Sequence, residues 1–276
     1  MVAVAVLGQG AVGRAAAERL AAAGHQVHAG DRADRAGVLA AGADVLVLAL
    51  TRGEECTAQL AEATAPVEGT PRLPPTVLDL TTQTPESASR CAELAAAAGS
   101  AYHGGGLSAG GRELRAGRAV LLLGPPVPPG TPAAAVVDAL GRALPFAAPD
   151  AAARAKVLHN WVLLAQQWAA ALALADARAH GIDGLPEVLA AGTAGRPVPE
   201  WSVVRDAAGE PSSTYLSRLA AKDLAVLART APTLATAAAP LLAELSRAFA
   251  RLPERPYTVA LLDAAGVPRS RQGEMS

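Results

Sequence analysis

Short apolar runs alternate with helical segments through the first half of the chain. The apolar runs cover residues 2–7, 43–50, 76–81 and 119–124, and alanine-rich stretches such as 85–98 separate them. Strands that alternate with helices predict an α/β fold with a doubly wound, mostly parallel sheet. The segment from residue 31 to residue 43 leaves room for about two helical turns, so we predict an abbreviated crossover there.

The second half of the chain has only helical pattern. Residues 150–180 contain neither Pro nor Gly and predict one helix of roughly eight turns that links two domains. We therefore place a first domain at residues 1–149 and an all-helical second domain at 150–276. Further helices are predicted at 185–193, 213–230, 232–251 and 256–265, with loops at 195–200 and 207–213.

Composition limits the classes of partner. A formal net charge of −1 gives no electrostatic reason to expect a nucleic acid or an anionic membrane. No eighteen-residue apolar run lacks charges and helix breakers, so we expect a cytoplasmic protein without a cleaved signal. Helices rich in alanine bury little core by themselves, and a long linking helix has more apolar surface than one small domain covers. We therefore expect a homodimer through the helical domain.

The two cysteines, Cys56 and Cys91, lie far apart in the sequence. They are too few for a disulfide framework or a metal site, and we predict two small buried thiols and no metal.

Residues 8–13 read GQGAVG, between the first apolar run and a helical segment. The spacing of Gly8, Gly10 and Gly13 permits a tight turn, backbone approach to a pyrophosphate and close helix–strand packing. Asp31 stands eighteen positions beyond Gly13, at the end of the second predicted strand. The combination predicts dinucleotide binding, and a merely tight strand–helix turn is the alternative.

The residues after the second strand point to two different nucleotides. Asp31 can accept hydrogen bonds from the adenosine ribose, which favours NAD, whereas Arg32 can meet the 2′-phosphate of NADP. Arg35 follows closely and can turn toward the same phosphate. We favour NADP, with NAD possible, and solvated surface charge is the alternative for both arginines.

Two polar segments, 79–88 (DLTTQTPESA) and 104–117 (GGGLSAGGRELRAG), follow predicted strands. Ligands of open parallel sheets bind outside the carboxyl ends of the strands. Thr81 is therefore a candidate cofactor contact, and Ser108 with the backbone of Ala109 and Gly110 a candidate site for substrate oxygens. Helix capping by Thr82 or Thr84 and loop flexibility of the glycines are the alternatives.

Among 24 basic side chains only two are lysines, Lys156 and Lys222. Arginine stays protonated in proteins, whereas a partly desolvated lysine can release a proton, as acid–base chemistry requires. Asn160, one turn beyond Lys156, can hold a substrate hydroxyl or fix the ammonium. These two residues belong to a mostly polar stripe on one face of the helix. The stripe predicts a helical face that lines a water-containing site, and a face toward bulk solvent is the alternative. Its members are Lys156, His159, Asn160 and Gln167, with Leu163 between them.

Five motifs in order, GQGAVG, DLTT, LSAG, KVLHN and AKDL, resemble the β-hydroxyacid dehydrogenases, which include 3-hydroxyisobutyrate dehydrogenase and tartronate semialdehyde reductase. The resemblance covers nearly the full length. It implies a Rossmann domain, a long interdomain helix and an all-helical second domain. It also implies an oxidoreductase that transfers a hydride between NAD(P) and a small 3-hydroxyacid or aldehyde-acid.

The same resemblance implies roles for single residues. Lys156 matches the catalytic acid or base, Asn160 a residue that orients the substrate, and Ser108 one that binds the substrate's carboxylate side. The predicted substrate contacts are Ser108, Ala109, Gly110 and His159. The predicted cofactor contacts are Gly8, Gln9, Gly10, Ala11, Val12, Gly13, Asp31, Arg32, Leu50, Thr51, Thr81 and Lys222.

Three positions depart from the family pattern. His159 stands where Asn is usual, Ala109 replaces a glycine, and GGG at 104–106 replaces a segment of acidic-Ala-Pro type. The last two resemble the imine reductases and reductive aminases, which reduce C=N bonds with NADPH. That group usually has Asp, Tyr or Asn in place of Lys156, so the lysine favours carbonyl chemistry. Imine reduction and a non-catalytic dinucleotide sensor remain the alternatives.

Overall fold

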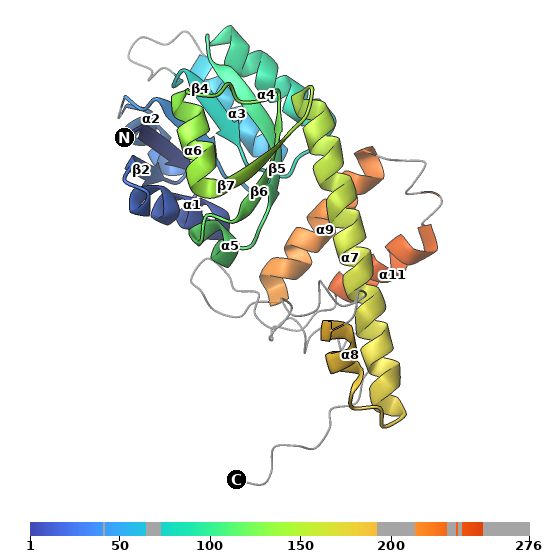
Figure 1. Cartoon of the computed structure of the whole chain (residues 1–276). Coiled ribbons are helices and arrows are strands. Elements are labelled where there is room, and N and C mark those ends of the chain that lie inside the picture. The colour runs from blue at the N-terminus through green and yellow to red at the C-terminus, as the bar shows by residue number, and fades with distance from the viewer. Residues whose placement is uncertain (41, 65–72, 192–212, 231–235, 237–238, 251–276) are drawn as a thin grey trace. The chain divides into compact units, whose positions relative to one another are not determined.

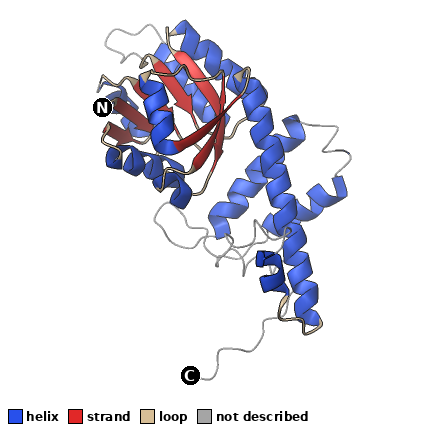
Figure 2. Cartoon of the chain, viewed as in Figure 1, coloured by secondary structure: helices blue, strands red, loops and turns tan. Residues whose placement is uncertain are grey.

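The computed structural model describes residues 1–40, 42–64, 73–191, 213–230, 236 and 239–250. The chain forms two compact units, Met1–Leu158 and His159–Ser276. The first unit contains every described strand, and the described elements of the second are helices (Figure 2). The α/β class with a helical C-terminal part is therefore confirmed.

The described strands form one seven-stranded sheet in the order β2-β1-β3-β4-β5-β6-β7 (Figure 1). Neighbouring strands are parallel, except that β5 and β6 are antiparallel. The strands are β1 (Ala3–Leu7), β2 (Gln26–Gly30), β3 (Val45–Leu48), β4 (Thr76–Asp79), β5 (Ala101–Ser108), β6 (Ala119–Gly124) and β7 (Gly141–Pro145).

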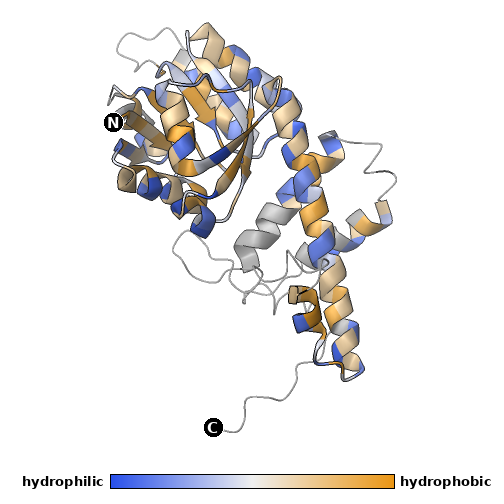
Figure 3. Cartoon of the chain, in the orientation of Figure 1, coloured by the Kyte–Doolittle hydropathy of each residue, from blue (hydrophilic) through white to orange (hydrophobic). Residues whose placement is uncertain are grey.

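Helices cover both faces of this sheet, and hydrophobic residues concentrate along its strands (Figure 3). Residues of β3 alternate between the two cores: Val45 and Val47 face one, and Leu46 and Leu48 face the other. A strand buried on both faces needs an unbroken apolar run, which explains the pattern in the sequence. One core includes α1 (Ala11–Ala22), α5 (Gly111–Arg115) and α6 (Pro132–Leu140), and the other α2 (Arg35–Ala40), α3 (Gly53–Thr64) and α4 (Pro85–Ala97).

The crossover from β2 to β3 is as short as the sequence predicts. It consists of the 3₁₀ helix η1 (Arg32–Asp34) and the six-residue α2, and it returns the chain past β1. Strand β3 then pairs with β1 from Val4–Val45 to Leu7–Leu48. The strand order therefore reverses between β1 and β3, at a topological switch point where α/β proteins bind ligands.

The glycines at 104–106 lie inside β5, so their reading as a flexible loop is wrong. Gly105 and Gly106 have φ values of +154° and +128°. A Cβ on Gly105 would lie 2.3 Å from Ala152 Cβ, in helix α7 (Pro149–Ala179). The glycines allow α7 to approach β5 closely, which local sequence pattern does not reveal.

The predicted long helix is present as α7, in which hydrophilic and hydrophobic residues are interleaved (Figure 3). The predicted helices at 185–193 and 213–230 are found as α8 (Leu185–Ala191) and α9 (Ser213–Thr230). Helix α11 (Ala239–Ala250) lies within the predicted 232–251 segment. The helix predicted at 256–265, the loop predicted at 195–200 and residues 207–212 of the second predicted loop fall outside the described residues, and Ser213 begins α9. None of the helices that the structure describes has the length and hydropathy needed to cross a membrane.

Both cysteines are buried free thiols, as predicted. Burial raises the pKa of Cys91 to about 12, and burial also raises the pKa of Cys56. Because both thiols stay protonated well above neutral pH, we expect no reaction with an aromatic disulfide reagent at pH 8 until the chain unfolds. A stoichiometric absorbance assay with and without denaturant tests this, and rapid labelling of the native protein would contradict it.

Candidate functional site

The glycine turn joins β1 to α1 through contacts that no side chain permits. Gly8 has a φ of +114°, and a Cβ there would lie 2.3 Å from the Ala49 carbonyl oxygen. A Cβ on Gly13 would lie 1.8 Å from the Gly8 carbonyl oxygen. Both glycines are therefore required for the turn to close against the first turn of α1 and the end of β3.

Gly10 differs, because a Cβ there would meet no protein atom within 4 Å. Gly10 is the N-cap residue of α1 and has no side chain to accept a hydrogen bond from the first turn. The first backbone N–H groups of the helix therefore remain available to a ligand. Ala11 and Val12 are the next residues, and the Gln9 side-chain amide donates to the Gly8 carbonyl oxygen at 3.2 Å. An open glycine at a helix N-terminus fits the pyrophosphate of a dinucleotide.

The end of β2 lies beside this turn. The Gly8 N–H donates to the Gly30 carbonyl oxygen at 3.0 Å, and Asp31 follows Gly30 as an exposed residue. Arg32 begins η1, and its side chain is outside the described structure. The fold thus places Asp31 next to the glycine turn, as the sequence predicts.

A buried hydrogen bond connects the loops after β3 and β4. The Leu50 N–H donates to Thr81 Oγ1 at 3.0 Å, and Thr81 is buried. Thr51 is exposed, and its N–H donates to Glu55 Oε2 at 3.3 Å. The structure therefore brings Leu50 and Thr81 together, with the threonine hydroxyl holding the loop.

Thr84 has the capping role that was the alternative interpretation of this segment. It is the N-cap residue of α4, and its hydroxyl oxygen accepts a hydrogen bond from the Ser87 N–H at 3.1 Å.

Ser108 is the last residue of β5, and Ala109 and Gly110 lead into α5. The Gly110 N–H donates to Glu113 Oε2 at 3.1 Å, so this amide already has an acceptor. Burial raises the pKa of Glu113, but hydrogen bonds, first that from Arg112, outweigh burial and leave the pKa below its ordinary value.

Lys156 lies on α7 with its aliphatic stem over β5. It is 6% exposed, and a Cβ added to Gly106 would lie 2.8 Å from Lys156 Cγ. Ser108 follows Gly106 by two residues on the same strand. The glycine strand thus seats the lysine near the end of β5 and keeps most of its side chain out of water.

Asn160 contacts a carboxylate that the sequence interpretation missed. Its Nδ2 donates to Asp223 Oδ2 on α9 at 2.7 Å. Lys222 Nζ lies 3.0 Å from Asp223 Oδ1, an ion-pair contact that does not meet hydrogen-bond geometry. His159, which is exposed, has Nδ1 3.2 Å from Asn160 Oδ1. The carboxylate fixes which way the Asn160 amide points, and the acidic neighbour of a rare lysine was the available signal for it.

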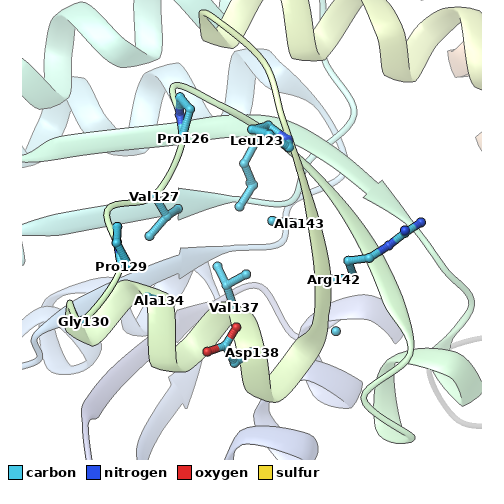
Figure 4. A pocket seen from close by; sticks show the side chains of 12 residues that line it. Leu123, Pro126, Val127, Pro129, Gly130, Ala134, Val137, Asp138, Arg142 and Ala143 are labelled. Atoms are coloured by element: carbon cyan, nitrogen blue, oxygen red, sulfur yellow. The ribbon is translucent and has the colours of Figure 1, made fainter.

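A separate open hollow of about 530 Å³ lies along the edge strand β7 (Figure 4). Its walls are mainly proline, alanine and valine, with the charged side chains of Asp138 and Arg142. None of the residues predicted to act on a ligand lines it. This hollow is therefore separate from the predicted ligand site.

A mostly parallel sheet with a glycine-rich first turn defines the first unit as a Rossmann-type domain, and known structures have a similar fold. Salmonella typhimurium 3-hydroxyisobutyrate dehydrogenase has a TM-score of 0.71 at 19% identity, over 95% of this chain and 99% of that one. Mycobacterium tuberculosis 3-hydroxyisobutyrate dehydrogenase with L-serine has a TM-score of 0.68 at 22% identity, over 95% of this chain and 98% of that one. Psf3 with NADP⁺ and 2-OPP has a TM-score of 0.70 at 19% identity, over 95% of this chain and 99% of that one.

These similarities confirm the fold that the motif resemblance implied. No family model matches the sequence, and no curated protein matches it.

Proposed function

We propose that the chain is an NAD(P)-dependent oxidoreductase acting on a small 3-hydroxyacid or aldehyde-acid, with NADP as the preferred cofactor. One observation carries the proposal: the buried Lys156 packs against Gly106 of β5, two residues before Ser108 on the same strand. A lysine that is kept largely out of water near the carboxyl ends of the strands is placed where a side chain can act as an acid or base on a bound ligand. The open turn at Gly10 supports the cofactor assignment.

The cofactor would supply or accept the hydride, and the chain's residues would do the rest. Lys156 would give a proton to the substrate oxygen during reduction and take it back during oxidation. The Ser108 hydroxyl would bind the substrate carboxylate. Asn160 would present its amide oxygen, which also lies 3.2 Å from His159 Nδ1, to a substrate hydroxyl, because Asp223 holds its amide nitrogen. We assign further substrate contacts to Ala109, Gly110 and His159.

The nucleotide would lie along the carboxyl ends of the strands. Residues 8–13 would hold the pyrophosphate, and Asp31 and Arg32 would contact the adenosine ribose and its 2′-phosphate. The nicotinamide half of the nucleotide would contact Leu50, Thr51 and Thr81. Lys222 would contact it near the substrate. That Psf3 was solved with NADP⁺ supports the preference for NADP.

We also propose that residues 1–149 form the nucleotide-binding domain, and that residues 150–276 contribute to the substrate site and form a homodimer. Val162 and Leu172 of α7 and Val188 of α8 are 50%, 45% and 65% exposed. Large apolar side chains exposed on helices favour association with a second copy. Sedimentation velocity over a dilution series tests the dimer, and a stable monomer at all concentrations would contradict it.

A cofactor screen tests the reaction. Oxidation of NADPH and NADH is followed with small aldehyde-acids and, in parallel, with cyclic imines, and reduction of NADP⁺ and NAD⁺ with small hydroxyacids. Turnover of aldehyde-acids or hydroxyacids is the expected result. Turnover of imines alone would replace the proposal with imine reduction. Nucleotide binding without any turnover would instead identify a sensor.

Gly106→Ala should displace the Lys156 side chain from its position over β5. The new Cβ would lie 2.8 Å from Lys156 Cγ, at a backbone φ of +128°. We expect turnover to fall about 10- to 100-fold, because small displacements of a catalytic group are costly. Gly99→Ala is the matched control, since Gly99 also has a positive φ of +78° but open space around it. Steady-state kinetics should show that the control keeps full turnover, and equal losses in both variants would refute the seating role.

A further inference from the structure

Asp79 is a fully buried carboxyl group at the end of β4, with 0% exposure. Its Oδ2 accepts hydrogen bonds from the Tyr102 hydroxyl at 2.8 Å and from Gln83 Nε2 at 3.0 Å. Its Oδ1 accepts one from the Thr81 N–H at 2.8 Å, and the Cys56 thiol lies at 3.8 Å. None of these partner groups carries a positive charge.

The direction of these hydrogen bonds favours an ionised carboxylate. Gln83 Nε2 also donates to the Tyr102 oxygen at 2.9 Å, and the Ser87 hydroxyl donates to Gln83 Oε1 at 3.0 Å. The network therefore directs its hydrogens toward Asp79. Burial raises the pKa of Asp79 above its ordinary value, and the hydrogen bonds from Thr81, Tyr102 and Gln83 reduce this rise without cancelling it. A protonated Asp79 would add a hydrogen where its partners already donate.

The position of Asp79 in the sheet relates it to the nicotinamide half of a dinucleotide. Leu80, the next residue, donates its N–H to the Leu48 carbonyl oxygen at 2.9 Å, which aligns the ends of β3 and β4. The glycine turn and Asp31 lie on the β1–β2 side of the switch point. With the adenosine half on that side, the other half of the dinucleotide extends over the ends of β3 and β4.

An oxidised nicotinamide ring carries a positive charge, and a reduced ring carries none. A buried anion whose hydrogen-bond partners are all neutral attracts a nearby cation strongly, because little water screens the pair. We propose that Asp79 makes the chain bind the oxidised nucleotide more tightly relative to the reduced one, and so sets the redox balance of the bound cofactor. The inference rests on the proposed function.

The test compares dissociation constants for NADP⁺ and NADPH, measured by calorimetry on the full chain. In Asp79→Asn, the ratio of the NADP⁺ constant to the NADPH constant should rise about tenfold, the size expected for a charge within about 10 Å at an effective dielectric constant of about 20. Asp79→Ser is a second neutral variant that introduces no amide, and it should raise the ratio similarly.

Ser87→Ala is the matched control, because it removes the outer hydroxyl of the same network and keeps the Asp79 charge. We expect it to leave the ratio unchanged, and thermal unfolding confirms that each variant is folded. If both neutral variants change the two constants by the same factor, Asp79 only holds the loops and the inference is overturned. If the wild-type chain binds neither nucleotide, the proposed function itself fails.

Discussion

Lys156→Ala is expected to lower turnover of the hydroxyacid or aldehyde-acid by 10²-fold or more, the usual loss when a general acid–base group is removed. Nucleotide affinity should stay within about threefold of wild type, because the glycine turn and the strand ends that would hold the nucleotide are unchanged. Single-turnover kinetics at saturating nucleotide, together with nucleotide titrations, separate the two quantities.

Lys156→Arg is the matched control for charge. It keeps a cation on the same helical position, but a guanidinium does not release its proton in a protein. If Lys156 transfers a proton, the arginine variant should be nearly as inactive as the alanine variant. If the lysine acts only by its charge, the arginine variant should recover much of the activity. Full turnover of the alanine variant would remove Lys156 from the mechanism.

Gly10→Ala is expected to weaken nucleotide binding about 10- to 100-fold, the cost of losing hydrogen bonds to a charged phosphate. The reason is geometric: an added Cβ meets no protein atom within 4 Å, so the turn can stay intact while the methyl group stands where the proposed pyrophosphate would approach the backbone. The Gly10 backbone is extended, with a φ of −72°, which alanine also adopts. Unfolding free energy should therefore change by less than about 1 kcal/mol.

Gly13→Ala provides the contrast. Its Cβ would lie 1.8 Å from the Gly8 carbonyl oxygen, so the turn must move. Overpacking of this kind costs about 1–3 kcal/mol, and urea denaturation should show that loss in the absence of nucleotide. A Gly10→Ala variant that is destabilised as much as Gly13→Ala, or that binds nucleotide normally, would show that the turn is only structural.

The elements that the sequence predicts well are those whose signals are local. The apolar run of β3 predicts a strand buried on both faces, and the unbroken 150–180 segment predicts α7 to within a residue at each end. The spacing of Gly8, Gly10 and Gly13 specifies a strand–turn–helix unit. The short segment after Asp31 predicts an abbreviated crossover, which is found as η1 and α2.

The residues that sequence interpretation missed depend on partners far along the chain. Asp79 had no assigned role, although a charged residue at the end of an apolar strand was a usable signal, and its partners Gln83 and Tyr102 had none. Asp223 is paired with Asn160, 63 positions earlier. Hydrogen bonds of this kind have no periodicity, so a single sequence does not reveal them.

By itself, the sequence determined most of the main elements but not strand β5, and it determined the glycine turn and the placing of Lys156 and Asn160 one turn apart on a single helix. Only the tertiary structure decided that the glycines of β5 form the seat of Lys156, and that Asp79 is enclosed by neutral donors. The physical reason is the separation along the chain over which each interaction acts. Backbone preference and hydrophobic period act over a few residues, whereas close packing and buried hydrogen bonds depend on which distant segments the fold brings into contact.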